Sequence, residues 1–195
     1  VIGWIVAASV NIPDNMNPFD LGSPIPWMLF LLIFAWTPPH FWALALYRSG
    51  EYGKVGIPML PDVKGAERTL KESKFYCILL FFIGSVPCFW PEYGLPLAWA
   101  FISGFLTLWY SISVWRIDPN EELDANGRMP LAFASFMRSL GYLAWMFISF
   151  VYIVAVPNEH IWHYTAAFII AVPLVNKLAV TWKDSNKNRK VLNAE

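Results

Sequence analysis

The sequence predicts an all-α protein, a polytopic bundle of helices that crosses a membrane several times. Hydrophobic residues make up 57% of the 195 residues, charged residues only 14%, and the mean hydropathy is +0.45. Ordinary soluble domains have about 45–50% apolar and about 25% charged residues, so the composition argues against a soluble globular protein. The formal net charge is zero, and the basic residues form no single patch of the kind that binds nucleic acid.

Five runs qualify as membrane helices, which need about 20 mostly apolar residues. They cover residues 24–47, 74–91 (shorter, but nearly free of charge), 95–115, 131–156 and 161–182.

The two ends of the chain carry further predictions. Residues 1–10, VIGWIVAASV, have the composition of the last turns of a sixth helix. Because the chain starts within that helix, at Val1 and not at a methionine, we expect residues 1–195 to be a single membrane domain that is truncated at its N-terminus. Residues 183–195 are expected to be a polar tail.

Lysine and arginine occur in only some of the connections. The loop 116–130 has two basic residues and the tail 183–195 has four, whereas the alternate connections have none. The loop 48–74 has six, namely Arg48, Lys54, Lys64, Arg68, Lys71 and Lys74. Since basic segments stay inside, we expect these three to face the cytoplasm or an organelle's matrix. The compact loops favour a bacterial inner membrane over a mitochondrial one.

The first long run carries Pro38, Pro39 and His40 in its second half. Proline lacks an N–H and its ring clashes with the preceding turn, so the pair predicts a break in the helix. Backbone groups freed within lipid must be buried in protein or line a wet cavity, and an ionisable group at this depth usually faces such an interior. Two interpretations of His40 stay open: a role in a substrate cavity, or a neutral histidine bonded to a neighbouring helix.

The helix leads into a loop rich in charge, glycine and proline. Carboxylates and cations at an inner membrane surface suit a Mg²⁺-bound phosphate group, because Mg²⁺ takes one or two carboxylates together with phosphate oxygens and Arg or Lys binds the remaining charge. The alternative is a solvated loop whose cations meet anionic lipid heads. The candidate residues are Tyr47, Arg48, Glu51, Tyr52, Lys54, Asp62 and Lys64.

Three further ionisable residues lie in or near later spans. Arg138 is about two turns from the inner end of its span, from where it either snorkels to the interface or reaches the same cavity as His40. His160 and His163 have a spacing compatible with shared metal ligation, but with no third ligand nearby we interpret them as interface histidines.

The stretch WTPPHFWALALYRSGEYGKVGIPMLPDVKG, residues 36–65, resembles the signature of the protoheme IX farnesyltransferase (heme O synthase) family, within the UbiA superfamily of intramembrane prenyltransferases. The opening VIGW resembles the end of that family's fifth helix, and FMRSLGYLAWMFI is a weaker match to its last helix. The resemblance covers residues 1 to about 156 and leaves the span 161–182 without a functional account.

This resemblance implies transfer of a farnesyl group from farnesyl diphosphate to a vinyl group of protoheme IX in a lipid bilayer, with Mg²⁺ on the diphosphate and heme A synthase as a further partner. On this basis His40, Tyr47, Arg48 and Glu51 are candidate catalytic residues, and Glu51 and Asp62 are candidate metal ligands. The candidate substrate-binding residues are Phe41, Trp42, Tyr52, Lys54, Lys64 and Arg138.

The sequence departs from the family pattern in three places. The superfamily's first aspartate-rich motif is missing, so we expect the isolated chain to make no heme O. Glu51 replaces the usual aspartate, and Asp62 stands where the family usually has valine. Two rival functions remain: a prenyltransferase with a quinone-precursor acceptor, and a transporter or non-catalytic heme-handling protein, since broken helices also occur in transporters.

Overall fold

The computed structural model describes residues 23–155 together with Thr165, Ile169 and Ala171. In this part of the chain every element is helical, which confirms the predicted all-α class. The elements are α2 (Ile25–Tyr47), α3 (Glu51–Lys54), α4 (Leu60–Ser85), the 3₁₀ turns η1 (Val86–Phe89) and η2 (Pro91–Tyr93), α5 (Leu97–Trp115) and α6 (Pro130–Ala155).

Four helices are long and apolar enough to cross a membrane: α2, α4 with η1, α5 and α6. The bounds of α2, α5 and α6 agree with the predicted spans to within two residues. Several predictions fall outside the described residues. They concern residues 1–10, the span 161–182, of which only Thr165, Ile169 and Ala171 are described, the tail 183–195 and the histidine pair at 160 and 163.

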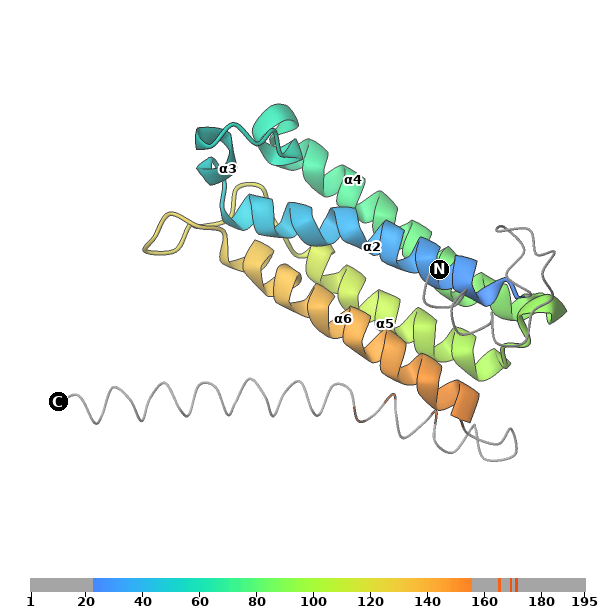
Figure 1. Cartoon of the computed structure of the whole chain (residues 1–195). Helices are drawn as coiled ribbons and strands as arrows, with labels where there is room; N and C mark the ends of the chain where they lie inside the picture. The colour runs from blue at the N-terminus through green and yellow to red at the C-terminus, as the bar shows by residue number, and fades with distance from the viewer. Residues whose placement is uncertain (1–22, 156–164, 166–168, 170, 172–195) are drawn as a thin grey trace, which may run out of the picture.

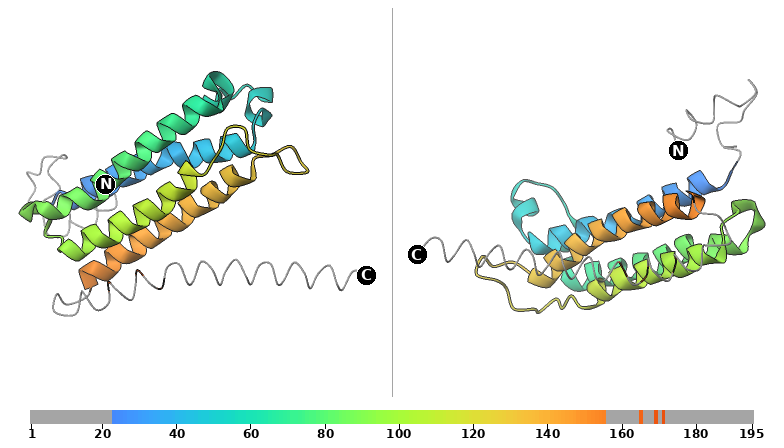
Figure 2. Two further views of the ribbon diagram at one scale, coloured as in Figure 1. Left: turned by 180° about the vertical axis from the view of Figure 1, so that it is seen from behind. Right: turned by 90° about the horizontal axis from the view of Figure 1, so that it is seen from below.

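The four long helices form an antiparallel bundle in two layers, α2 beside α6 and α4 beside α5 (Figures 1 and 2). Contacts between α2 and α4 and between α5 and α6 close the ring. Each long helix therefore packs against two neighbours, and its remaining surface carries exposed apolar side chains such as Phe34, Phe82 and Val151.

Small and hydroxyl-bearing residues line the helix contacts. Gly84 lies so close to α5 that an added Cβ would be 3.4 Å from the Cβ of Ser103. Ser113 on α5 lies within 3.2 Å of Ser135 on α6, and small or hydroxyl residues of this kind let membrane helices approach closely. Most buried hydroxyls also donate to a carbonyl of their own helix three or four residues earlier, as Thr107 does to Ser103 at 2.8 Å.

The predicted helix break at Pro38 and Pro39 is wrong. α2 runs without interruption from Ile25 to Tyr47 with both prolines inside it (Figure 1). Membrane helices tolerate proline because neighbouring helices and Ser or Thr side chains satisfy backbone groups near it. Just before the pair, the hydroxyl of Thr37 donates to the carbonyl of Ile33 at 2.7 Å, whereas the carbonyls that lose their helical N–H donors to Pro38 and Pro39 are those of Phe34 and Ala35.

The predicted loop 48–74 and span 74–91 are also corrected. α4 begins at Leu60, so its first turns contain charged residues that the sequence assigned to the loop, and it ends at Ser85, where 3₁₀ turns follow. The helical path is interrupted at Gly65 instead, with φ 80° and ψ 167°. Only glycine enters this backbone region without strain.

Gly65→Ala is therefore expected to lower the free energy of unfolding by about 1–3 kcal/mol, the usual cost of holding an L residue in this region. Thermal unfolding in detergent measures the change. Gly53→Ala is the matched control, because Gly53 has no positive φ and its added Cβ would meet only the Asp62 Cγ, at 3.8 Å. Equal stability of the two variants would contradict the assigned backbone conformation.

Both basic connections lie at one end of the bundle. Residues 48–59 join α2 to α4, residues 116–129 join α5 to α6, and Figure 1 shows α3 and the second connection at the same end. Residues 86–96 lie at the other end. This arrangement confirms that the two basic connections share one side of the bundle, as the charge pattern predicts.

Candidate active site

The connection from α2 to α4 folds back on itself. α2 ends at Tyr47, and Gly50, with φ 77°, turns the chain into α3. The N–H of Gly50 donates to Oδ1 of Asp62 at 3.2 Å, which joins the start of α3 to the first turn of α4. Asp62 sits where a helix favours negative charge. The two predicted metal ligands, Glu51 and Asp62, thus lie at the same end of the bundle.

The Glu51 carboxylate is held by two arginines. Nη2 of Arg128, at the end of the α5–α6 connection, donates to Oε1 of Glu51 at 2.8 Å. Nη1 of Arg48 is 3.7 Å from Oε2. Arg128 also donates to the Tyr47 hydroxyl at 3.4 Å and lies 5.2 Å above the Tyr47 ring. Its hydrogen bonds to Tyr47 and Glu51, with the charge of Glu51, raise the pKa of Arg128.

A groove of about 520 Å³ opens between α2 and α4, and its lining includes Leu60 and Lys64 from the first turns of α4. Trp42 of α2 and Tyr76 of α4 meet edge to face in it, with ring centroids 5.6 Å apart. Lys64 and Arg68 line its charged part, where Arg68 pairs with Glu72. The groove therefore places two cations next to two aromatic rings, a combination that suits a molecule with an anionic head and an apolar body.

Three of the groove's α4 residues follow one helical row. Arg68, Glu72 and Tyr76 are each four residues apart, and residues at this spacing lie on the same helix face, whereas Lys64 precedes the interruption at Gly65. Trp42 and Lys64 were predicted from the sequence as site residues, but Arg68 and Tyr76 were not. The four-residue spacing was the signal that could have identified them, had residues 60–74 been recognised as helical.

His40 lies between α2 and α6 and is only 7% exposed. Its ring stacks on Trp36 and Phe136, with centroids 4.2 and 4.7 Å away, and its Nδ1 is 2.6 Å from Oγ of Ser139. Since the Ser139 hydroxyl donates to the Phe136 carbonyl, His40 donates from Nδ1. This placement agrees with the interpretation of His40 as a histidine bonded to a neighbouring helix. A catalytic role for His40 stays a prediction.

The other candidate residues lie apart from the groove. Phe41 is 49% exposed and touches the edge of the His40 ring. Arg138 faces α5, where its guanidinium lies 5.3 Å above the Trp109 ring, so it does not join His40 on the α2 side. Tyr52 and Lys54 belong to α3, with Lys54 exposed.

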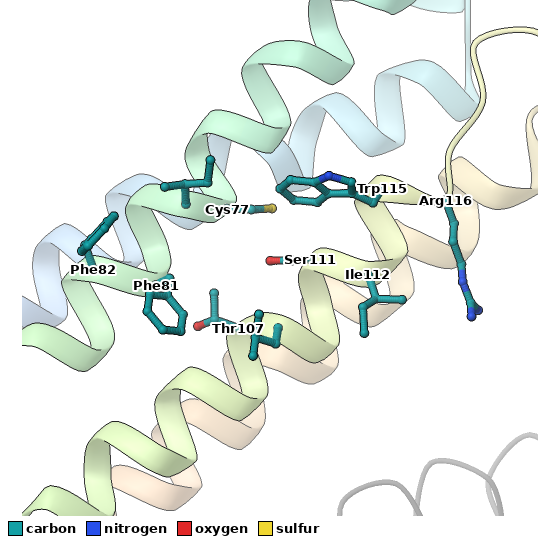
Figure 3. Close-up of a pocket in the computed structure, with 10 residues that line it drawn as sticks. Cys77, Phe81, Phe82, Thr107, Ser111, Ile112, Trp115 and Arg116 are labelled. Carbon is teal, nitrogen blue, oxygen red and sulfur yellow. The ribbon is translucent and has the colours of Figure 1, made fainter.

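A larger cavity of about 650 Å³ lies between α4 and α5 (Figure 3). Phe81 and Phe82 line it from α4, Ile112 and Trp115 from α5, and the Arg116 side chain points away from it. No carboxylate is among its lining residues. Its largely apolar lining therefore suits hydrocarbon.

Comparison with known proteins places this site in a family. The model of the UbiA prenyltransferase family matches residues 1–140, which is more than half of the chain and includes every candidate residue from His40 to Arg138. The chain belongs to the UbiA prenyltransferase family.

Curated relatives in this UbiA group bear the name protoheme IX farnesyltransferase. The protein from Parvibaculum lavamentivorans is 41% identical over 128 residues, 64% of this chain and 36% of the relative. The protein from Gluconobacter oxydans is 39% identical over 152 residues, 75% of this chain and 43% of the relative. The chain thus spans about two fifths of the length of the curated relatives it matches. No solved structure matches it significantly.

Glu51 and Asp62 carry the kind of oxygen donor that Mg²⁺ prefers, and Glu51 is already paired with Arg128 and Arg48. Glu51 and Asp62 supply hard oxygen donors, and each has one oxygen outside the hydrogen bonds given above. Mg²⁺ ordinarily uses one or two carboxylates with phosphate oxygens and water. No group of three or more histidine, cysteine or acidic residues lies together within residues 23–155, so phosphate and water would complete the shell.

Proposed function

We propose that the protein containing this chain transfers a farnesyl group from farnesyl diphosphate to a vinyl group of protoheme IX, forming heme O. The observation that carries the proposal is the groove in which Lys64 and Arg68 lie next to Trp42 and Tyr76. Two of its lining residues, Leu60 and Lys64, lie on either side of Asp62 in the sequence, and the names of the relatives support the same conclusion.

The reaction begins when the allylic C–O bond breaks and its electron pair leaves with the diphosphate. The vinyl π electrons then attack the allylic cation, and water adds to the new cation and loses a proton, which leaves the hydroxyethylfarnesyl substituent. Mg²⁺ bound at Glu51 and Asp62 would neutralise charge on the leaving diphosphate. A preorganised arrangement of charge of this kind usually supplies much of a rate enhancement.

The groove residues have distinct roles in this proposal. Lys64 and Arg68 bind phosphate oxygens through charge-assisted hydrogen bonds. The rings of Trp42 and Tyr76 attract the allylic cation with their faces and keep water away from it. Tyr47 and Arg48, at the end of α2, complete the polar wall beside Glu51.

The chain is an integral membrane protein by its family and its four membrane-length helices. We further propose that it resides in a bacterial inner membrane with the 48–59 and 116–129 connections in the cytoplasm, because basic connections stay on that side. The heme O product would pass to a heme A synthase.

The test expresses the complete gene product in a bacterium that lacks heme O synthase and identifies the extracted hemes by mass spectrometry. We expect heme O to appear with the protein and to depend on added Mg²⁺ in isolated membranes. Recovery of protoheme IX alone from membranes that contain the protein, or of a prenylated quinone precursor, would refute the proposal.

Lys64→Ala is expected to raise the KM for farnesyl diphosphate about tenfold, because a hydrogen bond to a charged group contributes roughly 1.5–3 kcal/mol. The KM for protoheme IX should stay unchanged. Lys71→Ala is the matched control, since it removes the same charge from the same helix outside the groove. Equal effects of both substitutions would show that only the general surface charge matters.

A further inference from the structure

The α5–α6 connection reaches the α2–α3 junction through one side chain. Arg128 and Glu51 are 77 residues apart in the sequence, yet Nη2 and Oε1 are 2.8 Å apart. The same guanidinium donates to the Tyr47 hydroxyl and lies over its ring. Arg128 therefore fixes Glu51 and the end of α2 at the same time.

Arg128 is itself fixed by a tight turn. Its N–H donates to Oδ1 of Asp124 at 3.0 Å, and its carbonyl accepts from the Asp124 N–H at 2.8 Å. Asn126 donates to the same Asp124 oxygen at 2.8 Å, and Gly127 supplies the left-handed φ of 72° that the turn requires. The guanidinium thus projects from an ordered backbone just before α6, which limits the entropy lost in holding Glu51.

The two Glu51 oxygens are held unequally. Arg128 hydrogen-bonds Oε1 at 2.8 Å, whereas Oε2 forms only a looser ion pair with Arg48 at 3.7 Å, beyond hydrogen-bond distance. The pair is partly exposed, 34% for Arg128 and 42% for Glu51, and exposed ion pairs contribute little to stability. The pair therefore contributes little to stability, while its geometry fixes how the carboxylate is oriented.

We propose that Arg128 is a positioning residue for the metal-dependent step. By holding Oε1, it presents Oε2 to a divalent cation that carries the diphosphate. Partners that orient a ligating carboxylate typically change metal affinity by about 10–100-fold. This inference rests on the proposed function. It predicts that Arg128 affects metal binding only when the Glu51 carboxylate is present.

The test uses the complete protein in detergent with Mn²⁺ as the probe and inorganic pyrophosphate present, and follows binding by electron paramagnetic resonance. Arg128→Gln should weaken Mn²⁺ binding about tenfold, Arg128→Lys should restore part of it, and the melting temperature should stay close to that of the unmodified protein. Arg116→Gln, in the same connection but on the α4–α5 side, is the control with no expected effect.

Two comparisons decide the outcome. In a Glu51→Gln background, Arg128→Gln should cause no further loss of Mn²⁺ affinity. In turnover, the Mg²⁺ concentration for half-maximal rate should rise while the KM for protoheme IX stays constant. Additive losses, tighter Mn²⁺ binding in Arg128→Gln, or a large drop in melting temperature would overturn the inference. Because the Mn²⁺ measurement needs no turnover, failure to make heme O would refute the proposed function separately.

Discussion

Glu51→Ala is expected to reduce heme O formation by about 100-fold or more, the usual cost of removing a charged group that stabilises a transition state. The substitution removes one of the two candidate metal-binding carboxylates and leaves Arg128 without its acidic partner. Initial rates measured by mass spectrometry of extracted hemes, over a range of Mg²⁺ concentrations, give the effect.

Two further variants sharpen this experiment. Glu51→Asp keeps the carboxylate and should retain part of the activity. Glu67→Ala removes an exposed acid from α4, away from the groove lining, and should leave the rate unchanged. Normal turnover in Glu51→Ala would remove that residue from the metal site and leave Asp62 as the remaining candidate.

His40→Ala is expected to lower the free energy of unfolding by about 2–4 kcal/mol, because truncating a buried ring leaves a cavity and unpaired polar groups. The ring is sandwiched between Trp36 and Phe136, and its loss would also leave the Ser139 hydroxyl without its donor. Thermal unfolding in detergent measures the change.

The matched control is Phe34→Ala, which removes an aromatic ring from the same helix at a position that is 59% exposed. Its unfolding temperature should change far less. His40→Gln, which keeps a hydrogen-bond donor, should recover part of the stability. If His40→Ala is as stable as the unmodified protein but makes no heme O, the residue acts in catalysis and the packing interpretation is wrong.

Hydropathy predicts the spans well where a helix is apolar throughout. The bounds of α2, α5 and α6 follow from runs that are almost free of charge. α4 is different, because its first half carries Lys64, Arg68 and Glu72, and such a charged stretch resembles a loop when only composition is considered. The pairing of Arg68 with Glu72 joins two of these charges on one face of the helix.

At the two prolines the error was the reverse, because a continuous helix was predicted to be broken. Pro38 and Pro39 predict a break from local sterics, but α2 is continuous and packs against α4 and α6. The interruption lies at Gly65, one of several glycines in a segment whose composition predicted a loop. A conformational preference of a few kcal/mol in one residue is smaller than the packing free energy of a whole helix. Packing against the adjacent helices therefore determines whether the helix continues.

The candidate site could be predicted only in part. The carboxylates and cations of the 48–64 segment are visible because they are close in the sequence. The partnership of Glu51 with Arg128 joins residues 77 apart, and no periodicity or spacing rule links them. The burial of His40 likewise depends on Phe136 and Ser139 of another helix.

The hydroxyls at the helix contacts have a consequence for how the protein is made. Thr69, Ser73, Thr107 and Ser149 each donate to a carbonyl of their own helix. A helix that leaves the translocon before its neighbours therefore carries these groups already hydrogen-bonded, so their exposure to lipid costs less than that of unpaired hydroxyls. Each span can enter the bilayer alone, and the contacts between helices can form afterwards by lateral association.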